Sequence, residues 1–119
     1  MIREFVRLPE FEKQSQSIGL SEDDIREIEN RLLADPSVGD IMEGTGGVRK
    51  FRFALPGVGK RGGARVVYID FLFYEKIYLL TVFAKSDISN LSKAERNELK
   101  HLVKMLEDEL RKKVQNGLV

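Results

Sequence analysis

The sequence predicts an α+β fold with helices packed on one face of a mostly antiparallel sheet. Three strand-like runs follow one another in the middle of the chain, and segments with helical apolar spacing precede and follow them. The length of 119 residues suits one domain with a modest core. We therefore expect a single domain over residues 1–119 with the element order β-α-α-β-β-β-α.

The first third of the chain predicts one strand and two helices. Residues 2–8 are strand-like, and Pro9 suits the first position of a short helix after them. Ser21 and Asp24 form a capping pair ahead of a second helix with apolar residues at helical spacing. Pro36 ends this helix, because proline disfavours the helical conformation in the residue before it.

The remainder predicts three strands and a long helix. Strand-like residues occupy 48–54, 64–73 and 77–84, with a glycine-rich turn after the first run and a short polar turn after the second. Ser92 and Glu95 form a capping box, and an apolar stripe follows along the last helix.

The composition excludes several kinds of site. The chain has no cysteine, which rules out disulfides and thiolate metal ligands, and His101 is its only histidine. We therefore expect no metal and no cofactor, and we interpret His101 as a boundary residue rather than a catalytic base. No signal-peptide pattern is visible, and no apolar run approaches the ~20 residues of a membrane span. We expect a cytoplasmic protein without membrane contact.

Charge is segregated along the chain, although the total is only +1. Residues 1–43 sum to −6, with 5 basic and 11 acidic side chains, whereas residues 44–69 sum to +6. No acidic residue lies between Glu43 and Asp70, and the basic ones there are Arg49, Lys50, Arg52, Lys60, Arg61 and Arg65. Such a block attracts phosphates. The alternative is a solvated surface, although such surfaces normally mix signs.

Alternation along strands predicts where these side chains point. Phe51 and Phe53 share one face and should pack on the helices, so Lys50 and Arg52 lie on the other face. Arg65 at the start of the next strand and Lys85 after the last one can reach the same face. We expect these four cations to converge on a concave surface; the alternative is that they deter aggregation at strand edges.

Two glycine-rich segments are candidate phosphate loops. GTGG at residues 44–47 lacks the Lys-Ser/Thr of such a loop and precedes a strand, so we interpret it as a turn within a loop over residues 37–47. GKRGG at residues 59–63 presents Lys60 and Arg61, and for these both phosphate contact and simple solvation remain open.

The run GTGGVRKFRFALPGVGKRGGARVVYIDF, followed by YLLTVFAKSDISNLSKAERNEL, resembles the RelE/HigB-type toxins of bacterial type II toxin–antitoxin systems, within the RelE/ParE superfamily. The resemblance covers roughly residues 1–110. It implies a small α+β fold and a ribosome-dependent endoribonuclease (mRNA interferase) that cuts mRNA in the A site and inhibits translation. It also implies a cognate antitoxin, often with a helix-turn-helix domain, through which alone the toxin would reach operator DNA.

The resemblance also implies which residues act. The basic positions of the family match the catalytic candidates Lys50, Arg52, Arg65 and Lys85. The basic block itself, rather than the resemblance, adds Arg49, Lys60 and Arg61 as RNA-binding candidates. The best-studied RelE proteins use an aromatic residue near the C-terminus, but here no tyrosine follows Tyr78 and no phenylalanine follows Phe83.

The chemistry assigns different roles to these cations. RNA is cut when its 2′-OH attacks the neighbouring phosphate, which requires a base, stabilisation of the phosphorane and an acid for the 5′-oxygen. Lys50 is the candidate base, because lysine can lose its proton and arginine essentially cannot. Arg52 and Arg65 suit phosphate clamps, and Lys85 suits an acid or another clamp.

Two other functions fit the same sequence. A ParE-like inhibitor of DNA gyrase shares the fold, but ParE-like chains lack the full cationic set. A non-catalytic nucleic-acid-binding module needs the basic face and no chemistry.

Overall fold

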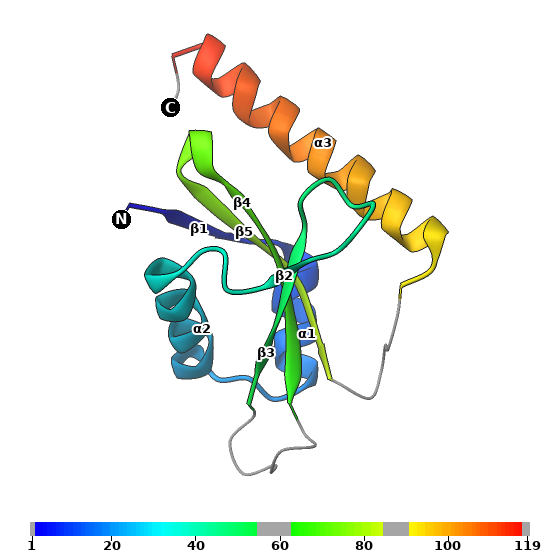
Figure 1. Ribbon diagram of the computed structural model, residues 1–119. Coiled ribbons are helices and arrows are strands. Elements are labelled where there is room, and N and C mark those ends of the chain that lie inside the picture. The colour runs from blue at the N-terminus through cyan, green and yellow to red at the C-terminus, as the bar shows by residue number, and fades with distance from the viewer. Residues whose placement is uncertain (1, 55–62, 85–90, 118–119) are drawn as a thin grey trace.

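The computed structural model describes residues 2–54, 63–84 and 91–117, which form a five-stranded sheet with helices on both faces (Figure 1). The strands are β1 (Glu4–Arg7), β2 (Asp40–Ile41), β3 (Arg49–Phe53), β4 (Ala64–Phe71) and β5 (Lys76–Ala84). The helices are α1 (Pro9–Ser17), α2 (Glu22–Ala34), the short 3-10 helix η2 (Leu72–Tyr74) and α3 (Lys93–Gln115). Three predicted site residues, Lys60, Arg61 and Lys85, lie outside the described residues.

The sheet has the strand order β1-β5-β4-β3-β2. β1 runs parallel to β5, and the other neighbouring pairs are antiparallel. The α+β class and the mostly antiparallel sheet are therefore confirmed. The loop expected over residues 37–47 contains the two-residue edge strand β2, which pairs with the start of β3.

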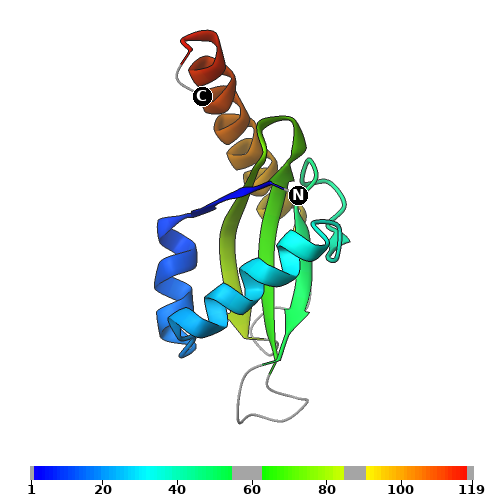
Figure 2. The ribbon, with the colours of Figure 1, turned by 90° about the vertical axis from the view of Figure 1, so that its left-hand side faces the viewer.

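The helices α1 and α2 pack on one side of the sheet, and Figure 2 shows α2 in front of it and α1 along its left-hand edge. Phe51 and Phe53 of β3 are buried in this layer with Val66 and Tyr68 of β4. The rings of Phe51 and Tyr68 meet edge to face at 5.8 Å between centroids. The prediction that the two phenylalanines of β3 pack on helices is confirmed.

The long helix α3 packs on the opposite face, behind the sheet in Figure 2. This corrects the expectation that the helices share one face. The physical reason is that β4 and β5 are apolar on both faces: Val67, Ile69 and Tyr78 are buried beneath α3, which removes them from water. In Figure 1, α3 crosses the upper part of this face and leaves the lower ends of β3 and β4 uncovered.

A β-bulge interrupts the pairing of β4 with β5. Val67 pairs with Thr81 and the next residue of β4 pairs with Leu79, so Leu80 is passed over in the register. Leu80 packs in the layer beneath α3, while Val82 packs in the layer beneath α1 and α2. Strict alternation would place Leu80 and Val82 on one face, and the bulge is the reason that it fails here.

Both predicted capping boxes are present. Ser21 and Asp24 cap the start of α2, and Ser92 and Glu95 cap the start of α3. The hydrogen bonds from Ser92 hold the pKa of Glu95 below its ordinary value, so its carboxylate stays ionised at the helix N-terminus.

Candidate functional site

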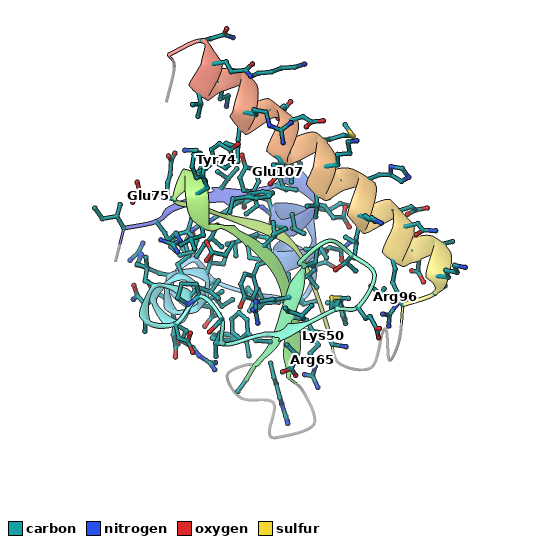
Figure 3. All side chains as sticks on the ribbon, turned by 45° about the horizontal axis from the view of Figure 1, so that its top comes forward. Lys50, Arg65, Tyr74, Glu75, Arg96 and Glu107 are labelled. Atoms are coloured by element: carbon teal, nitrogen blue, oxygen red, sulfur yellow. The ribbon has the colours of Figure 1, made fainter. Side chains whose placement is uncertain are left out.

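Lys50, Arg52 and Arg65 come together on the part of the sheet that α3 leaves uncovered, and we call these three residues the cationic cluster. Arg52 and Arg65 are direct partners across β3 and β4, and Lys50 lies two residues before Arg52 on the same face. Figure 3 shows Lys50 and Arg65 near each other at this end of the sheet. Of the four cations expected to share this face, Lys50, Arg52 and Arg65 do so, and Lys85 lies outside the described residues.

Arg65 occupies the centre of this surface. Its cross-strand partners are Arg52 on β3 and Phe83 on β5. One of its guanidinium nitrogens, Nη1, is buried and has no hydrogen-bond partner among the described residues. A buried donor without an acceptor is costly, whereas a phosphate oxygen would satisfy a guanidinium with a charge-assisted bond. The geometry therefore favours an anion beside Arg65.

The backbone of β3 at Lys50 is held by the segment that leaves α2. The Tyr68 hydroxyl donates to the carbonyl of Pro36 at 2.7 Å and accepts from the amide of Gly39 at 3.0 Å. A Cβ on Gly39 would lie 2.8 Å from the carbonyl oxygen of Lys50, so this close crossing requires glycine. Burial raises the pKa of Tyr68, which keeps the phenol protonated as a donor. Lys50 therefore projects from a firmly held strand.

Arg52 is positioned from both sides of the sheet. A Cβ on Gly63 would lie 3.1 Å from Nε of Arg52, so the absence of a side chain makes room for the arginine. From the other face, Arg31 of α2 donates to the carbonyl of Arg52 at 3.4 Å. The Arg31 guanidinium also lies over the Phe51 ring, 5.1 Å from its centre. These contacts hold the end of β3 in place and thereby position the Arg52 side chain.

Arg49, the remaining described candidate, is not brought into the cluster. It shares the face of Phe51, and its Nη1 donates to the carbonyl of Gly39 at 2.6 Å and to that of Ser37 at 3.4 Å. These bonds fasten the segment between α2 and β2 to β3. Arg49 therefore supports the strand from which Lys50 projects.

The Gly44–Gly47 segment is a turn, as predicted, and it also fastens α3 to the sheet. Its three glycines adopt positive φ angles. The buried Thr45 hydroxyl donates to one loop carbonyl at 2.6 Å and accepts from one loop amide at 3.1 Å. Arg96, at the N-terminal end of α3, donates to the carbonyl of Glu43 at 2.6 Å (Figure 3). Sequence reasoning missed Arg96, because its partner is distant along the chain.

A groove of about 600 Å³ adjoins the cationic cluster. Side chains of α1, β4, β5 and the N-terminal half of α3 line it. Phe83, the cross-strand partner of Arg65, forms part of its lining, so the groove lies next to the cluster. Sequence analysis did not reveal this groove, because no local pattern brings α1 and α3 to the same strand.

The described parts of the chain contain no group of three or more His, Cys, Asp or Glu side chains placed to hold a metal ion. No helix within the described ranges is long and apolar enough to cross a membrane.

The chain also matches a known protein family. The model of one family, described as the RelE toxin of the RelE / RelB toxin–antitoxin system, matches residues 9–118, which is nearly the whole chain. A match of this extent includes every described element after β1 and all three cations of the cluster. The chain therefore belongs to the RelE toxin family, whose members act as the toxin of a pair with a RelB-type antitoxin.

Proposed function

We propose that this RelE-family toxin is a ribosome-dependent endoribonuclease that cleaves mRNA in the A site and thereby inhibits translation. The observation that carries the proposal is the buried Nη1 of Arg65, a donor without an acceptor among the described residues, at the centre of the cationic cluster. A non-bridging oxygen of the scissile phosphate would be the hydrogen-bond acceptor that this nitrogen lacks.

The proposed reaction is an attack of a ribose 2′-OH on the neighbouring phosphorus. The O2′–P bond forms and the P–O5′ bond breaks, which leaves a 2′,3′-cyclic phosphate and a 5′-hydroxyl. Lys50 accepts the proton of the 2′-OH as general base. Arg65 and Arg52 bind the non-bridging oxygens and stabilise the negative charge that grows in the phosphorane.

The reaction also needs a general acid that protonates the 5′-oxygen as it leaves. Lys85 is our candidate, with the alternative that it is a further clamp; Lys60 and Arg61 are proposed to contact the RNA backbone. The cluster contains cations but neither a carboxylate nor an imidazole, so its acid–base chemistry is weak on free RNA. We propose that the ribosome compensates by holding the 2′-OH in line with the phosphate.

The partners follow from the same proposal. A cognate RelB-type antitoxin neutralises the toxin, and we propose that its helix-turn-helix domain provides the only contact of the pair with operator DNA. The ribosome and its mRNA are the targets, so the site of action is the cytoplasm.

Primer extension on a defined mRNA, translated in a reconstituted system, tests the proposal. We expect cuts confined to the A-site codon, and none on the same mRNA without ribosomes. Lys50→Arg keeps the charge but supplies no readily removable proton, so it should lose cleavage while still binding ribosomes. Gyrase-dependent DNA damage without mRNA cuts would establish the ParE-like function instead, and neither activity would leave a non-catalytic binding module.

A further inference from the structure

The groove beside the cationic cluster lies on the same row of the sheet as the cluster itself. Lys50 pairs with Val67, and Val67 pairs in turn with Thr81, so this row runs from β3 into the groove. Phe83, which also lines the groove, sits directly across from Arg65. A phosphate bound by Arg65 would therefore place the rest of its nucleotide within reach of the groove.

The two parts of this surface have opposite chemistry. The cluster consists of three cations, whereas the described residues that line the groove include no lysine or arginine. The groove instead combines apolar side chains, such as Phe83 and Leu99, with the carboxylates of Glu10, Glu95 and Glu98. A nucleotide has the same asymmetry, because its phosphate is anionic while its base is flat and uncharged. The charge pattern thus orients a nucleotide with its base in the groove.

Of the three carboxylates, Glu98 is the one available to a base. Glu95 accepts from the amide of Ser92 at 3.0 Å in the capping box of α3, and Glu10 accepts from the side chain of Gln14 at 3.1 Å. Glu98 has no hydrogen-bond or ion-pair partner among the described residues. An ionised carboxylate only accepts hydrogen bonds, and its two oxygens suit two adjacent donors. Guanine presents such a pair, N1–H and N2–H₂, whereas adenine offers the N6 amino group beside an acceptor.

Resting on the endoribonuclease function proposed above, we propose that this groove binds the base of a nucleotide that flanks the scissile phosphate, and that Glu98 selects guanine there. The Phe83 ring provides the apolar surface for the base. Selection by base contacts then adds to the sequence-independent hold of the cationic cluster on the phosphates.

Four mRNA templates that differ only in the base beside the cut, translated in the reconstituted system, test this specificity. We expect the wild-type toxin to cut the guanosine template about tenfold faster than the adenosine template. Glu98→Gln replaces one acceptor by a donor, which suits N1 and N6 of adenine, so the ratio should fall to one or reverse. Phe83→Leu should slow all four templates by about tenfold, because stacking does not discriminate between bases. Glu109→Gln, an exposed carboxylate of α3 that does not line the groove, should keep the wild-type ratio.

A binding measurement on the full chain distinguishes failure of this inference from failure of the proposed function. In amide NMR titrations, guanosine 3′-monophosphate should shift Thr81 and Leu99 more than adenosine 3′-monophosphate does, and Glu98→Gln should remove the difference. Absence of ribosomal cutting, with this preference intact, would overturn the endoribonuclease and keep the base site. Equal cutting of the four templates, or an unchanged ratio in folded Glu98→Gln, would overturn the base site. Weaker antitoxin binding by Glu98→Gln with an unchanged ratio would overturn it too and assign the groove to the antitoxin.

Discussion

Basic side chains occur in two regions of this sheet with opposite surroundings. At the β1 edge, Arg3 pairs with Asp70 at 2.8 Å, and Arg7 reaches Glu22 and Glu29 of α2 at 3.0 and 3.1 Å. In the cationic cluster, Lys50 and Arg65 have no ion-pair partner among the described residues. Residue type is the same in both regions, so it is the surroundings that separate the cations that hold the fold together from Lys50 and Arg65, which we propose contact the RNA.

The energetics of the two regions differ accordingly. Hydrogen bonds to Asp70 and Glu29 raise the pKa values of Arg3 and Arg7, which shows that their charges are stabilised by folding. The cluster places like charges on adjacent strands, where their repulsion opposes folding. A fold that keeps such an arrangement sacrifices some stability, as is common where activity requires a charged site. Substitutions should therefore affect stability in the first region and activity in the second.

The largest expected effect is on stability and lies on the face opposite the cluster. Phe51→Ala should lower the free energy of unfolding by about 3–5 kcal/mol, because it leaves a cavity between β3 and the α1–α2 layer. A thermal melt or a urea titration measures it. A melting curve unchanged from wild type would contradict the burial of Phe51 and the strand register on which the cluster depends.

The next effect is on activity. Arg65→Ala should reduce cleavage by about 10²–10³-fold, because it removes a charge-assisted contact to the phosphorane. The melting temperature should stay at or above that of wild type, because the substitution also removes an unsatisfied buried donor and a like-charge repulsion. Single-turnover cleavage on programmed ribosomes measures the loss, and growth arrest on expression provides a second readout. Arg111→Ala, which removes an exposed α3 arginine paired with Asp108, is the matched control and should cut normally. Full toxicity of well-expressed Arg65→Ala would move the site elsewhere.

The third effect, at the β1 edge, is a loss of stability without a loss of activity. Asp70→Asn leaves the largely buried Arg3 guanidinium without its carboxylate and should cost about 1–3 kcal/mol of stability. Cleavage per folded molecule should not change, because the Arg3–Asp70 pair lies outside the cluster. Chemical denaturation and ribosomal cleavage of the same preparation test both halves. A variant that is stable but inactive would erase the distinction between the two regions.

Period-two alternation was sufficient to place Lys50 and Arg52 opposite Phe51, because the strand repeat is a local property of the backbone. The capping boxes of α2 and α3 were predictable for the same reason. Alternation also places Arg49 with Phe51, so its assignment to RNA rested on charge count alone and ignored its face.

Features that depend on distant segments could not be derived in this way. The bulge at Leu80 adds one residue to a strand whose apolar pattern reads the same with or without it. The position of α3 depends on the fact that β4 and β5 are buried on both faces. The apolar sequence of these strands does not indicate which helix covers which face. The groove is lined by both Glu10 of α1 and Glu98 of α3, and only the tertiary structure brings these two helices to the same groove.

The smallest expected effect concerns the antitoxin and distinguishes two ways to inhibit the toxin. We predict that an acidic antitoxin segment covers the cationic cluster, because three like charges on one face of the sheet attract such a segment. Replacing Lys50 and Arg52 together by alanine should then weaken antitoxin binding by about three- to tenfold at low salt, which corresponds to roughly 0.2–1 kcal/mol for each exposed pair. Isothermal titration calorimetry at two salt concentrations measures the change, which should shrink at high salt.

The alternative is that the antitoxin grips the helices and prevents entry into the ribosome by its bulk. Lys104 and Arg111 provide a charge-matched control, because both are exposed on α3 and lie outside the cluster. Replacing both by alanine removes the same net charge, so it should leave affinity unchanged if the cluster itself is covered. If both double variants lose affinity equally, the attraction comes from the overall charge of the toxin. If the Lys50 and Arg52 variant alone keeps full affinity at low salt, direct cover of the cluster is ruled out, and inhibition by bulk remains.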